Sequence, residues 1–454
     1  MSLKKIVFGM MIWIGLLGNA DPVRPETAQE PDRFDLVGCI RQALRSNPSL
    51  EEARLGIDEA NVKLEAARLV RTPDIELFNR TGIVQDAVGD GVTGDQIDDE
   101  FGPFNRLEVM FTLPIYTFGR IGRSIKAAGE NLDRQRASEA KTAGDLILDV
   151  HRRYYGYVVT RQLSEATESI HKNFAEAYEA AEERLEKGDP LVTETDALKL
   201  KVGMSVVTSS LHKVRRELRV AKASLRQIMG MDDRVDFAVA DERLEPVEFD
   251  PAPLALYLKQ AREENPSIRQ VRAAVSAEES LYLAENSKYY PTLLAVGGLR
   301  HAIAPGREDQ DNPFLNDDYN FFDAGLSLGI KWDLDFWKTK NSLSAEKLRY
   351  LKMKSRLNGA LDSISLSVEE KYHRYTEKKD NLEASFEAKK AGRALLFLNL
   401  TNFRLGIGSG KDVFDALSLH ARVDGEYFQA VFEYNMAVVE LLNAVGKLTP
   451  DAYL

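Results

Sequence analysis

The stretch FRLGIGSGKDVFDA, Phe403 to Ala416, lies between two long amphipathic helical patterns near the C-terminus. Gly406, Gly408 and Gly410 can adopt the positive φ angles that a sharp turn between helices needs. Asp412 is suited to cap the helix that follows. The stretch therefore predicts the tip of a helical hairpin.

Composition and charge restrict what the chain can do. It has 454 residues, of which 44% are hydrophobic, and its formal net charge is -11. This acidity, without a basic stripe to offset it, argues against a nucleic-acid partner. The six histidines show no metal-ligand spacing, and the sequence carries no catalytic constellation. We therefore expect no enzyme activity, no metal and no cofactor.

Residues 1–20 have the pattern of a secretory signal peptide, in which Lys4 and Lys5 precede an apolar run that ends in small residues. That run is too short to span a bilayer. The single cysteine ends the sequence LVGC (36–39), which imitates a lipoprotein cleavage box, but a polar segment separates it from the apolar run. We expect Cys39 to be a buried helix residue rather than a site of lipidation.

Several motifs recur at a nearly constant offset. Asn47-Pro48 returns as Asn265-Pro266 (265 − 47 = 218), and VHRRYYGY (150–157) returns as VEEKYHRY (368–375) at the same offset. Ordered matches of this kind predict two copies of one unit. We divide the mature chain into a first unit, residues 21–250, and a second unit, residues 251–454.

The prolines indicate where long helices can run. None occurs between Pro114 and Pro190 or between Pro313 and Pro450, and an interior proline costs a helix about 3 kcal/mol. Apolar residues that step by four and three positions form a coiled-coil seam: Tyr427, Val431, Tyr434, Val438, Leu441 and Val445. We predict long helices over residues 120–187, 191–229, 339–405 and 411–447.

Between the helical segments the apolar period changes to two. Residues 322–334 and 106–113 alternate between apolar residues and polar or glycine residues, which predicts one β-hairpin per unit, over 74–116 and 292–336. The connecting loops are expected at 86–102 and 303–318. An apolar outer face suits a transmembrane β-barrel, with a soluble sandwich as the alternative. Because four strands cannot close such a barrel, several chains must share it.

The ordered motifs resemble those of the TolC-like outer-membrane efflux protein family over almost the whole mature chain. The resemblance rests on ALRSNP (43–48), on Pro73 and Pro291 at helix-to-strand junctions, and on LPIYTFGR (113–120). It implies a mainly α fold with a transmembrane β part, assembled as a homotrimer. Three chains would form a twelve-stranded β-barrel, four strands from each, continuous with a long α-helical coiled-coil barrel.

The same resemblance implies a function and a set of partners. The protein would be the passive exit duct of a tripartite efflux pump or a type I secretion system, in the outer membrane of a Gram-negative bacterium and extending into the periplasm. Outer-membrane lipid, a periplasmic adaptor and an inner-membrane transporter would be its partners.

The resemblance also implies a periplasmic aperture at the second tip. Asp412 and Asp415 match the aspartate pair of the family, share a helix face, and in three copies would form a ring of carboxylates. Phe403 and Gly408 stand where the best-known members carry a latching tyrosine and arginine, so other contacts, such as Lys411 or Arg404, would hold the mouth. The alternative for the aspartates is a helix cap and an outward acid in the first turn.

Both tips are the expected docking surface for the adaptor. The docking residues carried over are Gly188 and Asp196 in the first unit, and Arg404, Leu405, Gly406, Gly408 and Lys411 in the second. On the alternative interpretation the exposed cations are ordinary solvated charges. A second function class is a periplasmic coiled-coil adaptor or scaffold without a pore. The alternating strands favour the duct, because an adaptor does not need a membrane-type hairpin in each unit.

Overall fold

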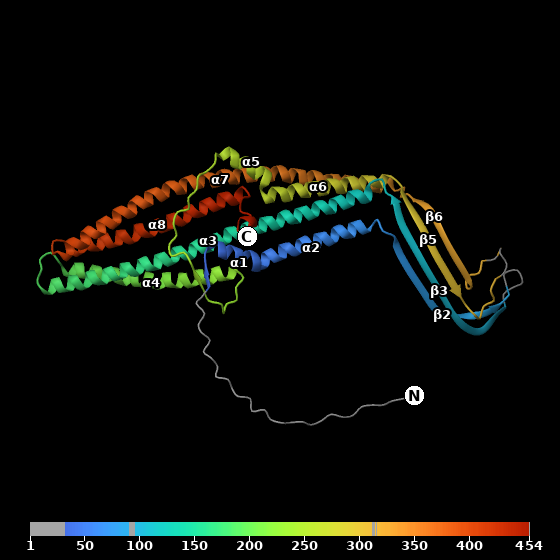
Figure 1. Cartoon of the computed structure of the whole chain (residues 1–454), viewed down its shortest axis with the longest axis horizontal. Coiled ribbons are helices and arrows are strands. Elements are labelled where there is room, and N and C mark those ends of the chain that lie inside the picture. Colours follow the sequence, from blue (N-terminus) through green and yellow to red (C-terminus); the bar gives the residue numbers. More distant parts are fainter. Residues whose placement is uncertain (1–31, 90–95, 311–313, 315, 454) are drawn as a thin grey trace, which may run out of the picture.

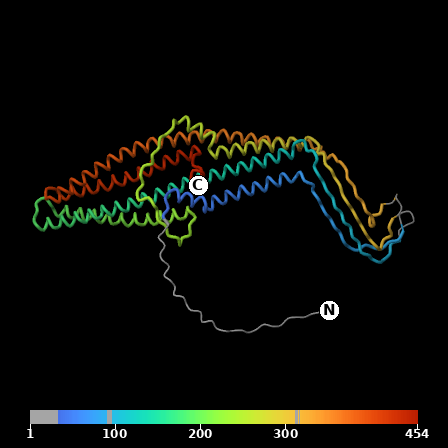
Figure 2. The backbone as a smooth tube through the Cα atoms, in the orientation of Figure 1, coloured from blue at the N-terminus to red at the C-terminus, as the bar shows by residue number. Residues whose placement is uncertain are grey.

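The computed structural model describes residues 32–89, 96–310, 314 and 316–453. The chain is elongated, with long helices at one end and a four-stranded sheet that continues them at an angle at the other (Figure 1). Each half of the chain runs to the strand end, back to the helical end, and then to the middle (Figure 2). The predicted signal peptide, residues 1–20, lies outside the described residues.

The two halves repeat one order of elements. The first contains β1 (Asp32–Phe34), α1 (Leu36–Ser46), α2 (Pro48–Leu69), β2 (Asp74–Val88), β3 (Gln96–Tyr116), α3 (Arg120–Glu186), α4 (Glu194–Ile228) and β4 (Phe237–Val239). The second contains α5 (Leu254–Glu264), α6 (Pro266–Asn286), η1 (Ser287–Tyr289), β5 (Thr292–Ile303), β6 (Phe321–Lys331), α7 (Phe336–Arg404), α8 (Gly410–Ala444) and η2 (Pro450–Ala452). The 67 residues of α3 and the 69 of α7 extend for about 100 Å each at 1.5 Å per residue.

The Asn-Pro motif has the same structural role in both halves. Asn47 caps α2, and its side-chain amide donates a hydrogen bond to the carbonyl of Ile228 at the end of α4 (3.1 Å). Asn265 caps α6 and donates in the same way to Ala444 at the end of α8 (2.8 Å). Each motif thus joins the start of one helix to the end of another, which accounts for its recurrence in the sequence.

The strands β2, β3, β5 and β6 form one antiparallel sheet in the order β2-β3-β5-β6. Ile75 pairs with Phe111, and Leu293 with Ile330, on an apolar face. The opposite face carries charged residues, since Glu108 pairs with Arg300 and Arg300 with Asp323. The predicted alternation between an apolar and a polar face is therefore confirmed over β6, although this strand ends at Lys331 and α7 already begins at Phe336.

The predicted loop at 86–102 is wrong, because both flanking strands extend into it. β2 continues to Val88 and β3 begins at Gln96, with a register shift between Gln85 and Ala87. Acidic residues are depleted in strands, yet Asp98 to Glu100 belong to β3 and stay exposed. Exposure keeps these carboxylates hydrated, and the three residues lie in the irregular stretch between the pairs Gln85–Phe101 and Ala87–Ile97.

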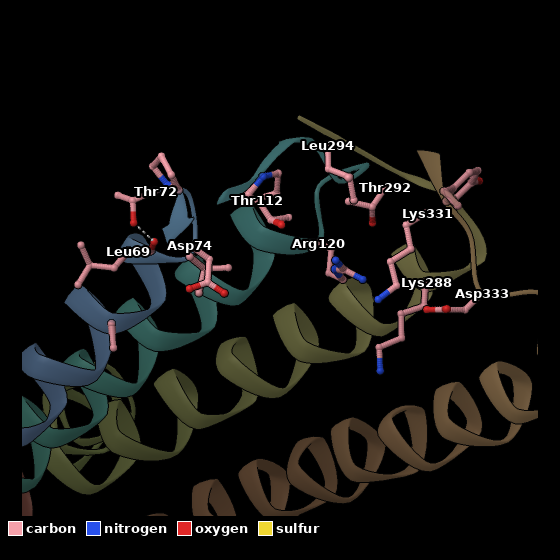
Figure 3. A pocket seen from close by; sticks show the side chains of 15 residues that line it. Leu69, Thr72, Asp74, Thr112, Arg120, Lys288, Thr292, Leu294, Lys331 and Asp333 are labelled. Atoms are coloured by element: carbon pink, nitrogen blue, oxygen red, sulfur yellow. Dashed lines mark hydrogen bonds between the residues drawn. The ribbon is translucent and has the colours of Figure 1, made fainter. Parts of the chain in front are cut away.

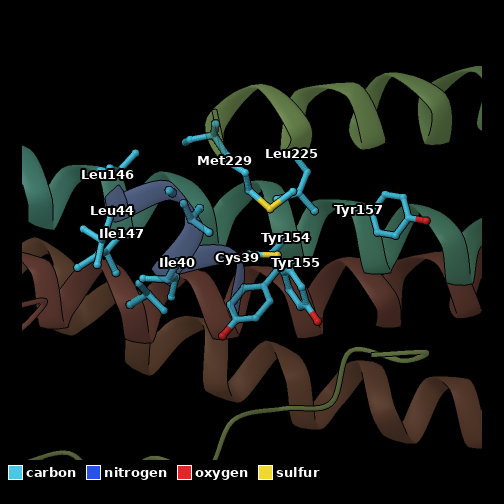
Figure 4. Close-up of a cluster of buried hydrophobic side chains, with 14 of the residues drawn as sticks. Cys39, Ile40, Leu44, Leu146, Ile147, Tyr154, Tyr155, Tyr157, Leu225 and Met229 are labelled. Atoms are coloured by element: carbon cyan, nitrogen blue, oxygen red, sulfur yellow. The ribbon is translucent and has the colours of Figure 1, made fainter. Parts of the chain in front are cut away.

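The largest hydrophobic core lies midway along the molecule, where α1 packs among the long helices (Figure 4). Cys39 and Ile40 are fully buried there, together with Ile147 and Tyr154 of α3 and Leu225 of α4. Burial, with a smaller contribution from the nearby carboxylates, raises the pKa of the Cys39 thiol to about 12. The prediction of a buried helix cysteine is confirmed, and the same burial leaves no room for a lipid.

The second half leaves much of its helical surface uncovered. Only six of the 69 residues of α7 are buried, and the apolar Leu348, Leu366 and Phe397 are 66%, 58% and 68% exposed. The predicted seam of α8 is buried from Val431 onward, whereas Tyr427 is half-buried. None of the described helices combines the length and the hydropathy that crossing a bilayer requires.

Candidate functional site

The two helical tips are the turns that connect α3 to α4 and α7 to α8 (Figure 1). Gly188 and Gly406, two positions after the ends of α3 and α7, have φ angles of +75° and +79°, which glycine adopts at low cost. The expectation of positive φ was wrong for Gly408 and Gly410. Glycine is needed there for space, since a Cβ would lie 3.0 Å from the Phe403 nitrogen and 2.8 Å from the Cβ of Asp196, respectively.

The helices that leave the tips begin with similar caps. Thr193 and Asp196 form a capping box at the start of α4. At the start of α8 the Ser409 hydroxyl accepts from the Asp412 backbone N–H (3.2 Å) and donates to the Asp412 carboxylate (2.7 Å). Asp412 is therefore the partner of the cap rather than the cap itself, which corrects the prediction.

Arg184, in the last turn of α3, joins the two tips. Its Nη1 donates to the carbonyls of Phe403 (3.0 Å) and Gly408 (3.2 Å), and its Nη2 donates to that of Gly406 (3.3 Å). Its Nε donates to Asp189 Oδ2 (2.8 Å), and its guanidinium lies 4.7 Å from the centroid of the Phe403 ring. We call this set of contacts the Arg184 clasp. It fixes the second tip against the first.

The pKa of the Asp189 carboxyl lies below its usual range. The first cause is the hydrogen bond from the Leu191 N–H to Asp189 Oδ1 (2.9 Å), and the second is the one from Arg184. The carboxylate is consequently ionised at neutral pH and holds the guanidinium in the orientation that reaches the carbonyls of the second tip.

Two residues assigned to the surface of the tips from the sequence lie inside them. Phe403 is 2% exposed and belongs to the hydrophobic core of the tips, so its ring does not line an aperture in this conformation. Asp196 is 8% exposed, because its carboxylate accepts from Thr193 and its Cβ lies against Gly410. Its position supports the junction between tips and offers little surface to a partner.

The other assigned residues lie at or near the surface of the tips. Asp412, Asp415 and Lys411 are exposed at the start of α8, and Leu405 is 69% exposed in the turn itself. Arg404 is exposed and forms an ion pair with Glu176 of α3 at 3.1 Å, so it also connects the two hairpins. Lys411 forms no ion pair with any residue that the structure describes.

Arg184 is the residue that sequence analysis missed. It lies 219 positions before Phe403, which is close to the repeat offset, so alignment of the two units would have placed the guanidinium opposite the aromatic ring. The alignment could not reveal that the two residues are in contact. Their contact depends on how the two hairpins pack against each other.

At the other end of the molecule the sheet has two unlike faces. On the apolar face Leu326, Leu328 and Ile330 are 75%, 81% and 72% exposed, which is unusual for large apolar side chains next to water. The charged face carries two ion pairs, Arg106 with Glu108 and Arg300 with Asp323, both at 2.5 Å. The sheet is therefore amphipathic over β3, β5 and β6.

Together, these features define a class of protein in which duplicated helical hairpins continue into a membrane-type β-sheet. A model of the outer membrane efflux protein family matches residues 39–231 and residues 257–447. The chain belongs to this family, and the resemblance inferred from its motifs is confirmed. Membership places it in the outer membrane of a Gram-negative bacterium, extending into the periplasm.

Individual relatives are distant. The cobalt-zinc-cadmium resistance protein CzcC of Cupriavidus metallidurans is 22% identical over 284 residues, which cover 62% of this chain and 62% of CzcC. Protein CyaE of Bordetella pertussis is 22% identical over 284 residues, covering 61% of this chain and 57% of CyaE. The aligned region thus spans less than two thirds of either relative.

Solved structures agree over most of the chain. The outer-membrane channel OprN has a TM-score of 0.74 at 15% identity, and the match covers 91% of this chain and 90% of the OprN chain. VceC of Vibrio cholerae has a TM-score of 0.74 at 16% identity, and the match covers 90% of this chain and 96% of VceC. At these identities the likeness establishes the fold.

Proposed function

We propose that the protein is the exit duct of a tripartite efflux pump or a type I secretion system, a passive conduit through the outer membrane and the periplasm. The observation that carries the proposal is the amphipathic sheet. Its apolar face is exposed, as a lipid-facing surface would be, while its charged face suits a water-filled interior. The helical hairpins that continue from it would extend the conduit into the periplasm.

The duct would be built from three copies of the chain. In the sheet of the described residues, β2 and β6 each have one neighbouring strand, and open edges do not persist in hydrocarbon. Three four-stranded sheets would give a closed twelve-stranded barrel, above the eight strands of the smallest membrane barrels. The uncovered apolar residues of α7 would be buried in the same assembly.

The helical tips would form the periplasmic mouth and the surface that meets the adaptor, with the inner-membrane transporter beyond it. Asp412 and Asp415, both exposed, would form the acidic ring of the aperture. Leu405, Arg404 and Lys411, with the turns at Gly188, Gly406 and Gly408, would provide the docking surface. The Arg184 clasp would hold the tips in place of a tyrosine and arginine latch.

Recordings from planar lipid bilayers test this function. The purified mature protein should insert and give discrete single-channel currents. A periplasmic adaptor or scaffold without a pore, the second function class, should remain soluble without detergent and give no current. That result would contradict the duct function and favour the scaffold.

A further inference from the structure

A cavity of about 590 Å³ lies where the four strands meet the helices (Figure 3). Its wall includes the end of α2, the start of α3, η1 and residues of all four strands. Its volume falls within the range of small-molecule binding sites. The cavity therefore spans one protomer's sheet from edge to edge and is large enough for a compact organic molecule.

The register of the sheet places the cavity on the charged face. Among its wall residues, Thr112 pairs with Val296, Thr292 pairs with Lys331, and Leu294 lies two positions beyond Thr292. The side chains at these positions lie on the same face of the sheet as Arg300, opposite the face that carries the apolar residues of β6. In the proposed barrel the cavity opens into the interior of the duct, along the route of the transported molecule.

Cationic side chains gather on one side of the cavity. Arg120 of α3 and Lys331 at the end of β6 point toward each other, and Lys288 of η1 lies beside them (Figure 3). Lys288 is paired with Glu285 at 2.9 Å. Within the described ranges, neither Arg120 nor Lys331 has a carboxylate within ion-pair distance. An anionic group between these two cations would interact favourably with both.

The remainder of the wall contains two acids and an apolar surface. Asp74 lies across the cavity from Lys331, on the side of Leu69, and Asp333 lies near Lys288 (Figure 3). Leu69 and Val70 are 60% and 54% exposed, so they offer contact area to an apolar group. The cavity thus combines a cationic side with an apolar side.

We propose that this cavity binds amphipathic organic anions on their way through the duct. The anionic group would lie between Arg120 and Lys331, and the apolar body would rest on Leu69, Val70 and Leu294. The inference rests on the proposed duct function, because only a conduit brings such molecules to the interior face. It assigns to the barrel end a transient binding site for one chemical class of cargo.

Block of single-channel current tests the site. The probe is 1-naphthalenesulfonate, and its counterpart of similar size and opposite charge is a naphthyl trimethylammonium salt. The anion should block the parent channel at lower concentration than the cation. Lys331→Gln should raise the half-blocking concentration of the anion by about five- to tenfold, because one charge-assisted contact is lost. Lys331→Arg keeps the positive charge, so the half-blocking concentration of the anion should equal that of the parent.

The control is Lys354→Gln, which removes an exposed lysine from α7 well away from the sheet and should leave the block unchanged. Equal half-blocking concentrations for the parent and Lys331→Gln, or equal block by the anion and the cation, would overturn the binding site while leaving the duct intact. A protein that inserts but passes no current would overturn the duct and the site together.

Discussion

At the residue scale, Arg184 determines how the tips are held together. One guanidinium satisfies three carbonyls of the second tip, stacks on Phe403 and is itself held by Asp189. The sequence alone favours Lys411 or Arg404 for this role. Arg404 contributes one exposed ion pair, which is worth little in water, whereas the side chain of Arg184 is only 14% exposed.

Removing the clasp should loosen the tips. Arg184→Ala leaves three carbonyls without their donor, which should weaken the junction by about 2 kcal/mol, roughly a 30-fold shift toward separated tips. We expect a higher mean single-channel conductance. The control, Lys187→Ala, removes an exposed cation one turn away whose partner is Glu183 of the same helix. If both variants conduct like the parent, the clasp does not restrain the mouth.

The clasp should also respond to acid through Asp189. Because the pKa of this carboxyl is lowered in the folded tip, its contribution to stability is complete above the ordinary aspartate pKa and is lost as the pH falls through the lowered value. Conductance should therefore be steady near neutrality and should rise below about pH 4. Asp189→Asn should conduct more than the parent at pH 7. If Asp189→Asn and the parent have the same conductance at every pH, Asp189 does not have this role.

The aspartate ring makes a separate prediction. In the double variant Asp412→Asn/Asp415→Asn, the side-chain oxygen at position 412 can still accept a hydrogen bond from the Ser409 hydroxyl. The variant removes up to six charges from a trimeric mouth. Block by a trivalent cation such as hexaamminecobalt(III) should weaken roughly tenfold. Glu194→Gln, at the exposed start of α4, serves as the control. Unchanged block in the double variant would mean that the two aspartates are ordinary outward acids.

At the element scale, the duplicated Asn-Pro motif couples helices that are distant in sequence. Asn265 is 6% exposed and satisfies groups on both α6 and α8. Asn265→Ala removes a cap and leaves the Ala444 carbonyl without its donor, which should cost about 2 kcal/mol of unfolding free energy. Thermal unfolding in detergent, followed by circular dichroism, should show a lower midpoint.

The matched control for that change is Asn381→Ala. Asn381 is exposed and its hydrogen bond to Glu377 stays within α7, so its loss should change stability by less than about 0.5 kcal/mol. If the two substitutions lower the midpoint equally, the Asn265 bridge between the helices is not what stabilises this part of the fold.

Sequence periodicity predicted the long helices well, because their signals are local. The proline gaps and apolar seams place each long helix within three residues of its observed ends. The strands of the first hairpin are longer than composition predicts. Asp98, Asp99 and Glu100 have loop-like composition, and in the structure they form the irregular stretch of β3 between the pairs Gln85–Phe101 and Ala87–Ile97. Phe403 and Asp196 were misplaced because their burial depends on packing between tips more than 200 residues apart.

At the scale of the whole molecule, one chain leaves its main surfaces incomplete. Within the part of the chain that the structure describes, nothing covers the apolar face of the sheet or the exposed apolar residues of α7, and no strand pairs with the outer edges of β2 and β6. The duct proposal satisfies them together, since the sheet would meet lipid outside and sibling strands at each edge, while α7 would pack against a neighbouring copy. The core around Cys39, by contrast, is complete within the protomer.

Native mass spectrometry of the mature protein released from detergent measures the number of copies directly. We predict a complex of three identical chains that persists when the detergent is removed in the gas phase. A single chain at every protein concentration, with no higher assembly, would contradict the shared barrel on which the proposed function depends.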